Sequence, residues 1–385
     1  MKLISFFCAF MLLYGLLHYY IGLRGWQAFR NMGIFSWMPA WNWALLVTLL
    51  ALLYPLSRAA VNFLPRKAAQ VLIFAGSYWM AILYYLLLIV LAVDLLRLIN
   101  HFTGFFPHNL FKLPAFLGMG ALLFIMLILL YGTWNANHPV VRDYELIVDK
   151  KPEDIKELRI AVVSDIHLGW IVGIDRMAGM VKTINSLQPD LVFMVGDIID
   201  EGVDPLSERK IPAMLGSLNP RYGAYAVLGN HEYISGNVEK TAGYMDKADI
   251  TVLRDQWAKV AGSIYVVGRD DQACKRFSGH ERLSLTALMS EIPRQDLPII
   301  LLAHEPVELE IAEIEGVDVQ FSGHTHLGQL FPNNFITQAI YENDWGYLKK
   351  GNLQVVVSAG FGTWGPPIRI GNRPEIVNVL VKFQS

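Results

Sequence analysis

The sequence predicts a protein of two parts, a helical membrane region followed by an α/β layered domain. Of its 385 residues, 54% are hydrophobic and only 17% are charged, whereas a soluble domain averages about 25% charged residues. Long apolar stretches fill the chain up to about residue 136. From about residue 155, short apolar runs alternate with amphipathic segments, which is typical of strands alternating with helices.

Four apolar stretches in the first part are each near the ~20 residues that cross a bilayer. They cover about residues 3–23, 41–63, 71–98 and 113–134, and tryptophans gather at their edges, as at a membrane interface. We therefore expect residues 1–136 to form four transmembrane helices of a multi-pass membrane protein. An even number of spans puts both ends of the chain on one side. The distribution of Lys and Arg favours the cytoplasm for the second part.

Two charged residues, Asp94 and Arg97, lie near the end of the third apolar stretch. Because they are close to its exit, we expect both side chains to extend toward the lipid headgroups. Residues 137–154 are polar enough to be a linker between the two parts. The α/β domain is then expected over residues 155–385.

The expected strands of the second part are short apolar runs. They are residues 158–164, 191–195, 224–228, 263–268, 299–302, 317–321, 354–358 and 376–383, with helices at 174–187 and 238–247. Five polar motifs follow five of these strands directly. They are Asp165-Ile166-His167, Gly196-Asp197-Ile198-Ile199-Asp200, Gly229-Asn230-His231-Glu232, the lone His304, and Gly323-His324-Thr325-His326. Ligands of open α/β sheets bind beyond the carboxyl ends of the strands, so we expect the motifs to converge.

The motifs supply the side chains that a pair of divalent metals needs for phosphate-ester hydrolysis. Asp197 is our choice for the carboxylate shared by both metals, and Asn230 offers a neutral oxygen beside an anionic substrate. Asp165 and His167 alternate along an extended exit, so Gly169 and its loop are expected to redirect one of them. His304, His324 and His326 would complete the ligand shells. Mixed nitrogen and oxygen ligation favours Mn, Fe or Zn, with Mn preferred.

Three further residues are candidates for work on the substrate. A protonated His231 could donate to the leaving-group oxygen, with Asp200 orienting its imidazole; the alternatives are a substrate-positioning donor and a helix cap. Arg369 is expected to bind the substrate phosphate, against the alternative of a solvated loop arginine. Glycines 196, 229 and 323 are expected to let the backbone turn beside the ligands.

These five blocks resemble the calcineurin-like metallophosphoesterase superfamily, whose pattern is DxH, GDxxD, GNH[DE], a lone His and GHxH. The resemblance covers about residues 155–385 and implies a two-sheet β-sandwich flanked by helices, with a dinuclear metal centre. It assigns one metal to Asp165, His167, Asp197 and His326, and the other to Asp197, Asn230, His304 and His324, with His231 and Asn230 at the substrate. The segment 358–369 is similar to a bacterial, membrane-linked subgroup, which more often has Gly at the position of Leu327.

We expect a membrane-anchored metal-dependent phosphoesterase of the phosphodiesterase type. Its substrate would be a phosphodiester or pyrophosphate, lipid-linked because the active site lies near the bilayer. The alternatives are a phosphomonoesterase or protein phosphatase, and a membrane receptor or scaffold with a silent phosphoesterase fold. The net charge of −2 lacks a basic footprint, so no nucleic acid partner is expected. The sequence indicates no oligomeric state.

Overall fold

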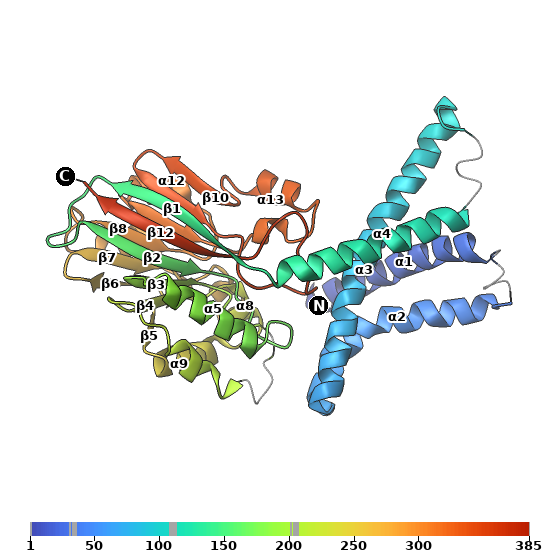
Figure 1. Ribbon diagram of the computed structural model, residues 1–385, viewed down its shortest axis with the longest axis horizontal. Helices are drawn as coiled ribbons and strands as arrows, with labels where there is room; N and C mark the ends of the chain where they lie inside the picture. The colour runs from blue at the N-terminus through green and yellow to red at the C-terminus, as the bar shows by residue number, and fades with distance from the viewer. Residues whose placement is uncertain are drawn as a thin grey trace. The chain divides into compact units, whose positions relative to one another are not determined.

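The computed structural model describes residues 2–30, 32, 37–107, 114–200, 202 and 208–384 (Figure 1). The chain divides into two compact units. One comprises Met1–Gly132 with Gly365–Pro367, and the other comprises Thr133–Trp364 with Ile368–Ser385.

The first unit is helical. Its elements are α1 (Lys2–Phe29), α2 (Ala40–Ala60), the 3₁₀ helix η1 (Val61–Phe63), α3 (Arg66–Thr103) and α4 (Pro114–Ala136). Within the described residues, three helical segments are long and apolar enough to cross a membrane, namely Ala40–Ala60, Arg66–Thr103 and Ala115–Ala136. These three support a membrane protein. That α1, a helix of 28 residues, is a fourth span stays a prediction.

Asp94 does not extend toward headgroups as the sequence suggested. Its carboxylate accepts a hydrogen bond from the Tyr20 hydroxyl at 2.6 Å and lies 2.6 Å from the Arg24 guanidinium, both on α1. Arg97, one turn further along α3, is 3.2 Å away. A carboxylate in an apolar helix bundle is costly unless paired, so the ion pair between helices replaces solvation by headgroups.

The second unit contains two six-stranded sheets, which confirms the expected two-sheet fold (Figure 1). The first sheet has the order β1-β12-β2-β3-β4-β5 and the second β10-β11-β9-β8-β7-β6. The bounds of the strands are β1 Val140–Val148, β2 Glu157–Val163, β3 Leu191–Val195, β4 Ala224–Val227, β5 Ile250–Val252, β6 Gln256–Val260, β7 Ile264–Gly268, β8 Ile299–Leu302, β9 Val319–Ser322, β10 Gly346–Lys350, β11 Leu353–Val357 and β12 Glu375–Phe383.

Three apolar clusters hold the layers together. Between the sheets, Phe193 of β3 packs against Phe321 of β9 with ring centroids 5.8 Å apart. On the outer face of the first sheet lie α5 (Ile174–Ser186), α7 (Ile211–Leu215) and α9 (Val238–Lys247). On the outer face of the second lie α11 (Leu285–Ser290) and α12 (Leu309–Ile314). The remaining short helices are α8 (Asn230–Ile234), α10 (Ala273–Phe277), η3 (His326–Gly328) and α13 (Asn334–Ile340).

The expected linker at residues 137–154 is wrong over half of its length. Residues 140–148 form β1, which pairs in parallel with β12 from Val140 opposite Glu375 to Val148 opposite Phe383. Successive β1 side chains alternate between more and less exposed positions. An edge strand with one face in solvent has a polar composition, which is why the sequence suggested a connection. The strands β5, β6 and β10 were likewise not anticipated.

The direction of the strands decides where the motifs meet. β2, β3 and β4 run parallel to one another, as do β7, β8 and β9. Their carboxyl ends therefore lie at one edge of each sheet. β12 runs antiparallel to β2 and parallel to β1. The chain thus enters β1 at the same edge at which β2 ends.

Candidate metal centre

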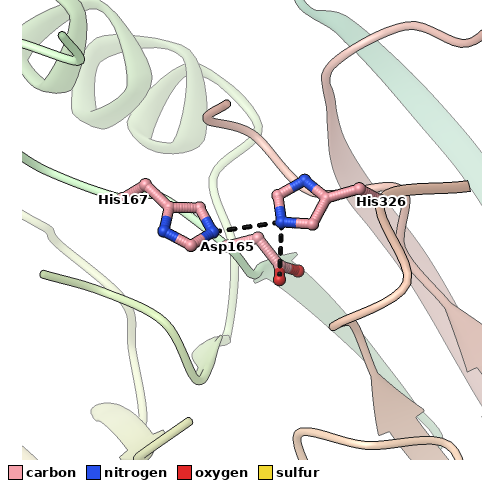
Figure 2. Close-up of side chains that lie close together, drawn as sticks. All are labelled: Asp165, His167 and His326. Carbon is pink, nitrogen blue, oxygen red and sulfur yellow. Dashed lines mark hydrogen bonds and ion pairs between the residues drawn. The ribbon is translucent and has the colours of Figure 1, made fainter. Parts of the chain in front are cut away.

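The five motifs converge at the carboxyl ends of β2, β3, β4, β8 and β9. Asp165, His167 and His326 form one group of ligand atoms that all lie within 4.8 Å of one another. The Nε2 atoms of His167 and His326 are 3.0 Å apart, and Asp165 Oδ1 lies 3.3 Å from His326 Nε2 (Figure 2). All three residues are buried. Two imidazole nitrogens and a carboxylate oxygen pointing at one another form a donor set suited to a divalent transition metal.

Asp197, His304 and His324 form a second group of the same kind. Asp197 Oδ2 lies 3.1 Å from His304 Nε2 and 3.8 Å from His167 Nε2, so this carboxylate stands between the two groups. The Asn230 side-chain oxygen lies 2.9 Å from His324 Nδ1. Seven side chains expected as metal ligands therefore lie together in one place.

Left-handed backbone at the strand ends turns these side chains inward. Asp165, His167 and Asp197 have φ of 51°, 48° and 51°, and His324 and His326 have φ of 70° and 50°. Asp and His adopt this region more readily than most residues, at a cost that recurs at functional sites. The expectation that Gly169 redirects one side chain of the first motif is wrong, because Asp165 and His167 are themselves in the left-handed conformation.

Two of the motif glycines are required because a neighbouring carboxylate lies too close for a Cβ atom, not because the backbone has a positive φ. A Cβ on Gly229 would lie 2.2 Å from Asp197 Oδ1, and one on Gly323 would lie 2.3 Å from Asp165 Oδ2. Neither glycine has a positive φ, whereas Gly196 has φ of 79°. The absence of a side chain at 229 and 323 lets the backbone of one motif pack against the carboxylate of another.

The electrostatics of the cluster fit a bound cation. Burial alone would raise the pKa of Asp197, but the charge and hydrogen bond of His304 hold it well below its usual range. Burial would lower the pKa of His304, and the Asp197 carboxylate instead holds it well above its usual range. A divalent cation would supply the positive charge that the His304 proton otherwise provides, so metal binding would release that proton.

The other imidazoles are already in the form that coordinates metals. Burial lowers the pKa of His167 and His326, and it lowers the pKa of His324 to about 4, with a further contribution from His304. A neutral imidazole is the ligating form. The donor set, its burial and its protonation therefore fit the dinuclear centre that the sequence predicted.

His231 and Asp200 lie beside the centre as a pair. His231 Nδ1 is 3.3 Å from Asp200 Oδ1, and the His231 side chain is largely buried. Burial opposes the charged form, but the hydrogen bond that the ring donates to Asp200 and the charge of Asp197 outweigh it and raise the pKa of His231 to about 9. The imidazole is therefore protonated at neutral pH and able to donate a proton.

Glu232 is an important residue to which sequence reasoning assigned no role. Its fully buried carboxylate accepts hydrogen bonds from the backbone N–H groups of Asp197 (3.2 Å), Ile198 (2.8 Å), Ile199 (2.9 Å) and Gly229 (2.8 Å). It thereby fixes the two loops that carry Asp197 and Asn230. The available signal was a Glu three residues after Gly229, the spacing of a capping box.

Arg369 does not bind substrate as the sequence predicted, because its side chain is 0% exposed. All of its donors face acceptors of the loops beneath the centre, namely the carbonyls of Gly362, Ala359 and Gly360 and the side-chain oxygen of Asn372. Its Nη2 also lies 3.3 Å from His326 Nδ1. Arg369 therefore positions the loop under a ligand, and its charge helps to keep His326 neutral.

Comparison with known proteins places this geometry in a family. The model of the calcineurin-like phosphoesterases matches residues 158–328. A metallophosphoesterase of Aquifex aeolicus is 33% identical over 245 residues, which cover 63% of this chain and 91% of that protein. The chain belongs to the calcineurin-like phosphoesterase family.

Vertebrate members of the calcineurin-like family carry a membrane region as well. A transmembrane protein with metallophosphoesterase domain from Danio rerio is 35% identical over 274 residues, and its counterpart in Bos taurus is 33% identical over 261. The matches cover 68% and 64% of this chain but only 62% and 58% of those proteins. A crystal structure of a dimetal phosphatase from Danio rerio matches 54% of this chain and 88% of its own length, with 12% identity and a TM-score of 0.35.

Proposed function

We propose that the protein is a membrane-anchored, metal-dependent phosphoester hydrolase. The observation that carries the proposal is the convergence of two groups of ligand atoms, each within 4.8 Å, on either side of Asp197. Five strand ends contribute to this arrangement, and all the ligand types of the family are present. The bound cations would supply charge neutralisation of the phosphoryl oxygens and a water of lowered pKa.

We assign Asp165, His167 and His326 to one cation, and Asn230, His304 and His324 to the other, with Asp197 shared. Asn230 adds an oxygen without adding negative charge, which favours an anionic substrate. Nitrogen and oxygen donors of this kind suit Mn, Fe or Zn, and we propose Mn. Glu232 and Arg369 hold the loops that present these ligands.

In the proposed reaction His231 holds the proton that the leaving oxygen needs. Its raised pKa keeps that proton in place at neutral pH, and Asp200 fixes the orientation of the ring by facing Nδ1. The Nε2 atom is then left to face the substrate. The Trp364 ring lies edge-on to His231 at 6.1 Å between centroids.

We further propose a phosphodiester or pyrophosphate substrate that is lipid-linked, in a bacterial inner membrane, with the catalytic domain in the cytoplasm. The membrane helices that precede the domain support a substrate held in the bilayer. In this proposal the membrane region covers residues 1–136 with four spans, and the catalytic domain begins at β1.

The test uses the full-length protein purified in detergent and stripped with chelator. Turnover of bis(p-nitrophenyl) phosphate is measured as Mn²⁺, Zn²⁺ or Fe²⁺ is added back, and metal content is measured in parallel. We expect two metals per chain and metal-restored turnover in the wild type. The Asp197→Asn variant, which lacks the shared carboxylate, should no longer bind two metals together and should show no turnover. Bound metal without turnover on mono- or diesters would instead favour a receptor or scaffold.

A further inference from the structure

The short helix α13 leaves its apolar side chains in solvent. None of its residues is buried, and Phe335, Ile336 and Ile340 are exposed by 60%, 57% and 67%. Trp364, on a separate loop, is exposed by 58%. These four residues are called the apolar rim below. Helices of soluble domains normally turn such side chains toward the core, and large exposed apolar groups mark contact surfaces.

The apolar rim borders the metal centre. Tyr341, the residue after α13, lies 6.1 Å from the His324 ring between centroids, and Trp364 lies at the same distance from the His231 ring. The Gln329 side chain exchanges two hydrogen bonds of 2.8 Å with the backbone of Trp364. Whatever covers the rim therefore lies next to the candidate metal centre.

A short stretch of chain connects this edge of the domain to the end of α4. Only residues 137–139 separate the end of α4 from the start of β1, a distance of at most about 14 Å. β1 begins at the edge where β2 ends in the first metal motif. The Asn135 side chain, in the last turn of α4, also donates to the carbonyls of Arg369 (2.9 Å) and Asn372 (2.6 Å). Asn135, which belongs to the second unit, therefore contacts the loop beneath His326.

We propose that the apolar rim inserts into the bilayer interface and admits an acyl-chain phosphodiester to the metal centre from the membrane. Trp and other large apolar side chains favour this interface. We commit to the bilayer as the occupant because only residues 137–139 connect a helix that is long and apolar enough to cross a membrane with the edge of the domain that carries the rim. The inference rests on the proposed hydrolase function and names its substrate class, a phosphate ester carrying a lipid chain.

The kinetic test compares two substrates that share a leaving group. Hexadecyl p-nitrophenyl phosphate in phosphatidylcholine–phosphatidylglycerol vesicles is compared with soluble methyl p-nitrophenyl phosphate, using full-length protein in the same vesicles. The triple variant Phe335→Ser/Ile336→Ser/Ile340→Ser should lower kcat/KM for the hexadecyl ester at least about tenfold and change that for the methyl ester less than about twofold. The control Ile314→Ser alters an exposed residue that precedes β9, at the opposite end of the sheet, and should affect neither.

A direct test locates the rim. Ile340→Cys and, separately, Ile314→Cys are introduced after Cys8→Ser and Cys274→Ser, and each new cysteine is labelled with a fluorophore. Nitroxide-bearing lipid should quench the label at 340 and spare the label at 314. A label at 340 that is quenched only by aqueous iodide, or shielded from both quenchers by a bound protein, would overturn the inference. Equal loss of activity on both esters in the triple variant would do the same.

The outcomes also separate this inference from the proposed function. If the metal-loaded wild type cleaves the methyl ester but the label at 340 is not reached by lipid, the rim proposal alone fails. If the wild type binds metal and cleaves neither ester, the hydrolase proposal fails.

Discussion

The floor of the metal centre and its apolar rim are built in opposite ways. The floor consists of polar side chains that are almost completely buried, such as Asp165, Asp197 and His304. The rim consists of apolar side chains that are mostly exposed, on α13 and around Trp364. In most proteins, apolar side chains are buried and charged side chains are exposed, which is the reverse of the arrangement here. Both inversions need compensation, by a cation and a hydrogen-bonded frame in the floor and by a covering surface at the rim.

Because the two regions are built differently, substitutions in the floor should affect catalysis, whereas substitutions at the rim should affect access of the substrate. In the floor, replacing one residue should also disturb its neighbours, because these side chains share hydrogen-bond and metal partners. At the rim, each side chain should contribute separately, in proportion to the apolar area that it exposes. The predictions below test this contrast.

The largest effect is expected for removal of a ligand from the floor. His326→Gln should reduce kcat for bis(p-nitrophenyl) phosphate by at least about 10³-fold, since residues that act as a unit fail together. Metal content per chain should fall by one in the same preparation. The control His280→Gln alters an exposed histidine outside the motifs and should leave both quantities unchanged. A His326 variant with full metal content would contradict the assignment.

Arg369→Met should destabilise the domain by about 3 kcal/mol, because it leaves buried carbonyls without their charged donor. Denaturant unfolding of the full-length protein in detergent measures this loss. Arg369→Lys should recover only part of it, because a lysine cannot reproduce the planar set of donors. In the fraction that remains folded, KM should stay close to the wild-type value. A large rise in KM with unchanged stability would restore the role in substrate binding.

Glu232→Gln should lower the free energy of unfolding by about 2 kcal/mol. The amide puts an NH₂ donor in the place of one carboxylate oxygen, which accepts hydrogen bonds from the loop backbone. Burial, with the charge of Asp197 next in importance, raises the pKa of Glu232 to about 7. Because this pKa lies above the ordinary value of 4.5, the stability that Glu232 contributes falls as the pH rises toward and through about 7, and the loss in the Gln variant should be larger at pH 6 than at pH 8. Unfolding measured at both pH values checks the sign. A loss that is equal at both values, or larger at pH 8, would contradict the raised pKa of Glu232.

Asp200→Asn should shift the pH profile of kcat rather than abolish turnover. His231 must be protonated to act as an acid, so activity is lost as the pH rises through its pKa of about 9. Without the Asp200 charge that pKa should fall toward the ordinary value near 6.5. The alkaline limb should then move to lower pH by about one to two units. An unshifted alkaline limb would exclude His231 as the acid that Asp200 supports.

The smallest effect is expected for a single rim residue on a soluble substrate. Trp364→Leu keeps an apolar side chain, so kcat/KM for the methyl ester should change less than about twofold. Trp364→Ser removes the apolar surface and should lower turnover of the hexadecyl ester selectively. Loss of methyl ester turnover in both variants would place Trp364 in the floor instead of the rim.

Most of the catalytic fold was predictable because its signals are local. The buried strands that became β3 and β8 were predicted with the bounds that the structure gives them, since parallel central strands are continuous apolar runs. The helices α5 and α9 were predicted to within one residue. β1 was missed because an edge strand half in solvent has no such run. Asp94 was misjudged because its partners on α1, Tyr20 and Arg24, are seventy or more residues away in sequence.

The sequence by itself determined which residues gather at the strand ends, because each motif directly follows its strand and parallel strands end at one edge. It also determined the chemical types of the ligands and the family. Only the tertiary structure showed which groups Arg369 and Glu232 contact and that the rim residues are exposed. Arg369 could be told from a substrate-binding arginine only by its partners, which are backbone carbonyls brought together by loop packing. The exposure of α13 was likewise decided by packing, because a short apolar helix has the same sequence pattern whether it faces a core or a bilayer.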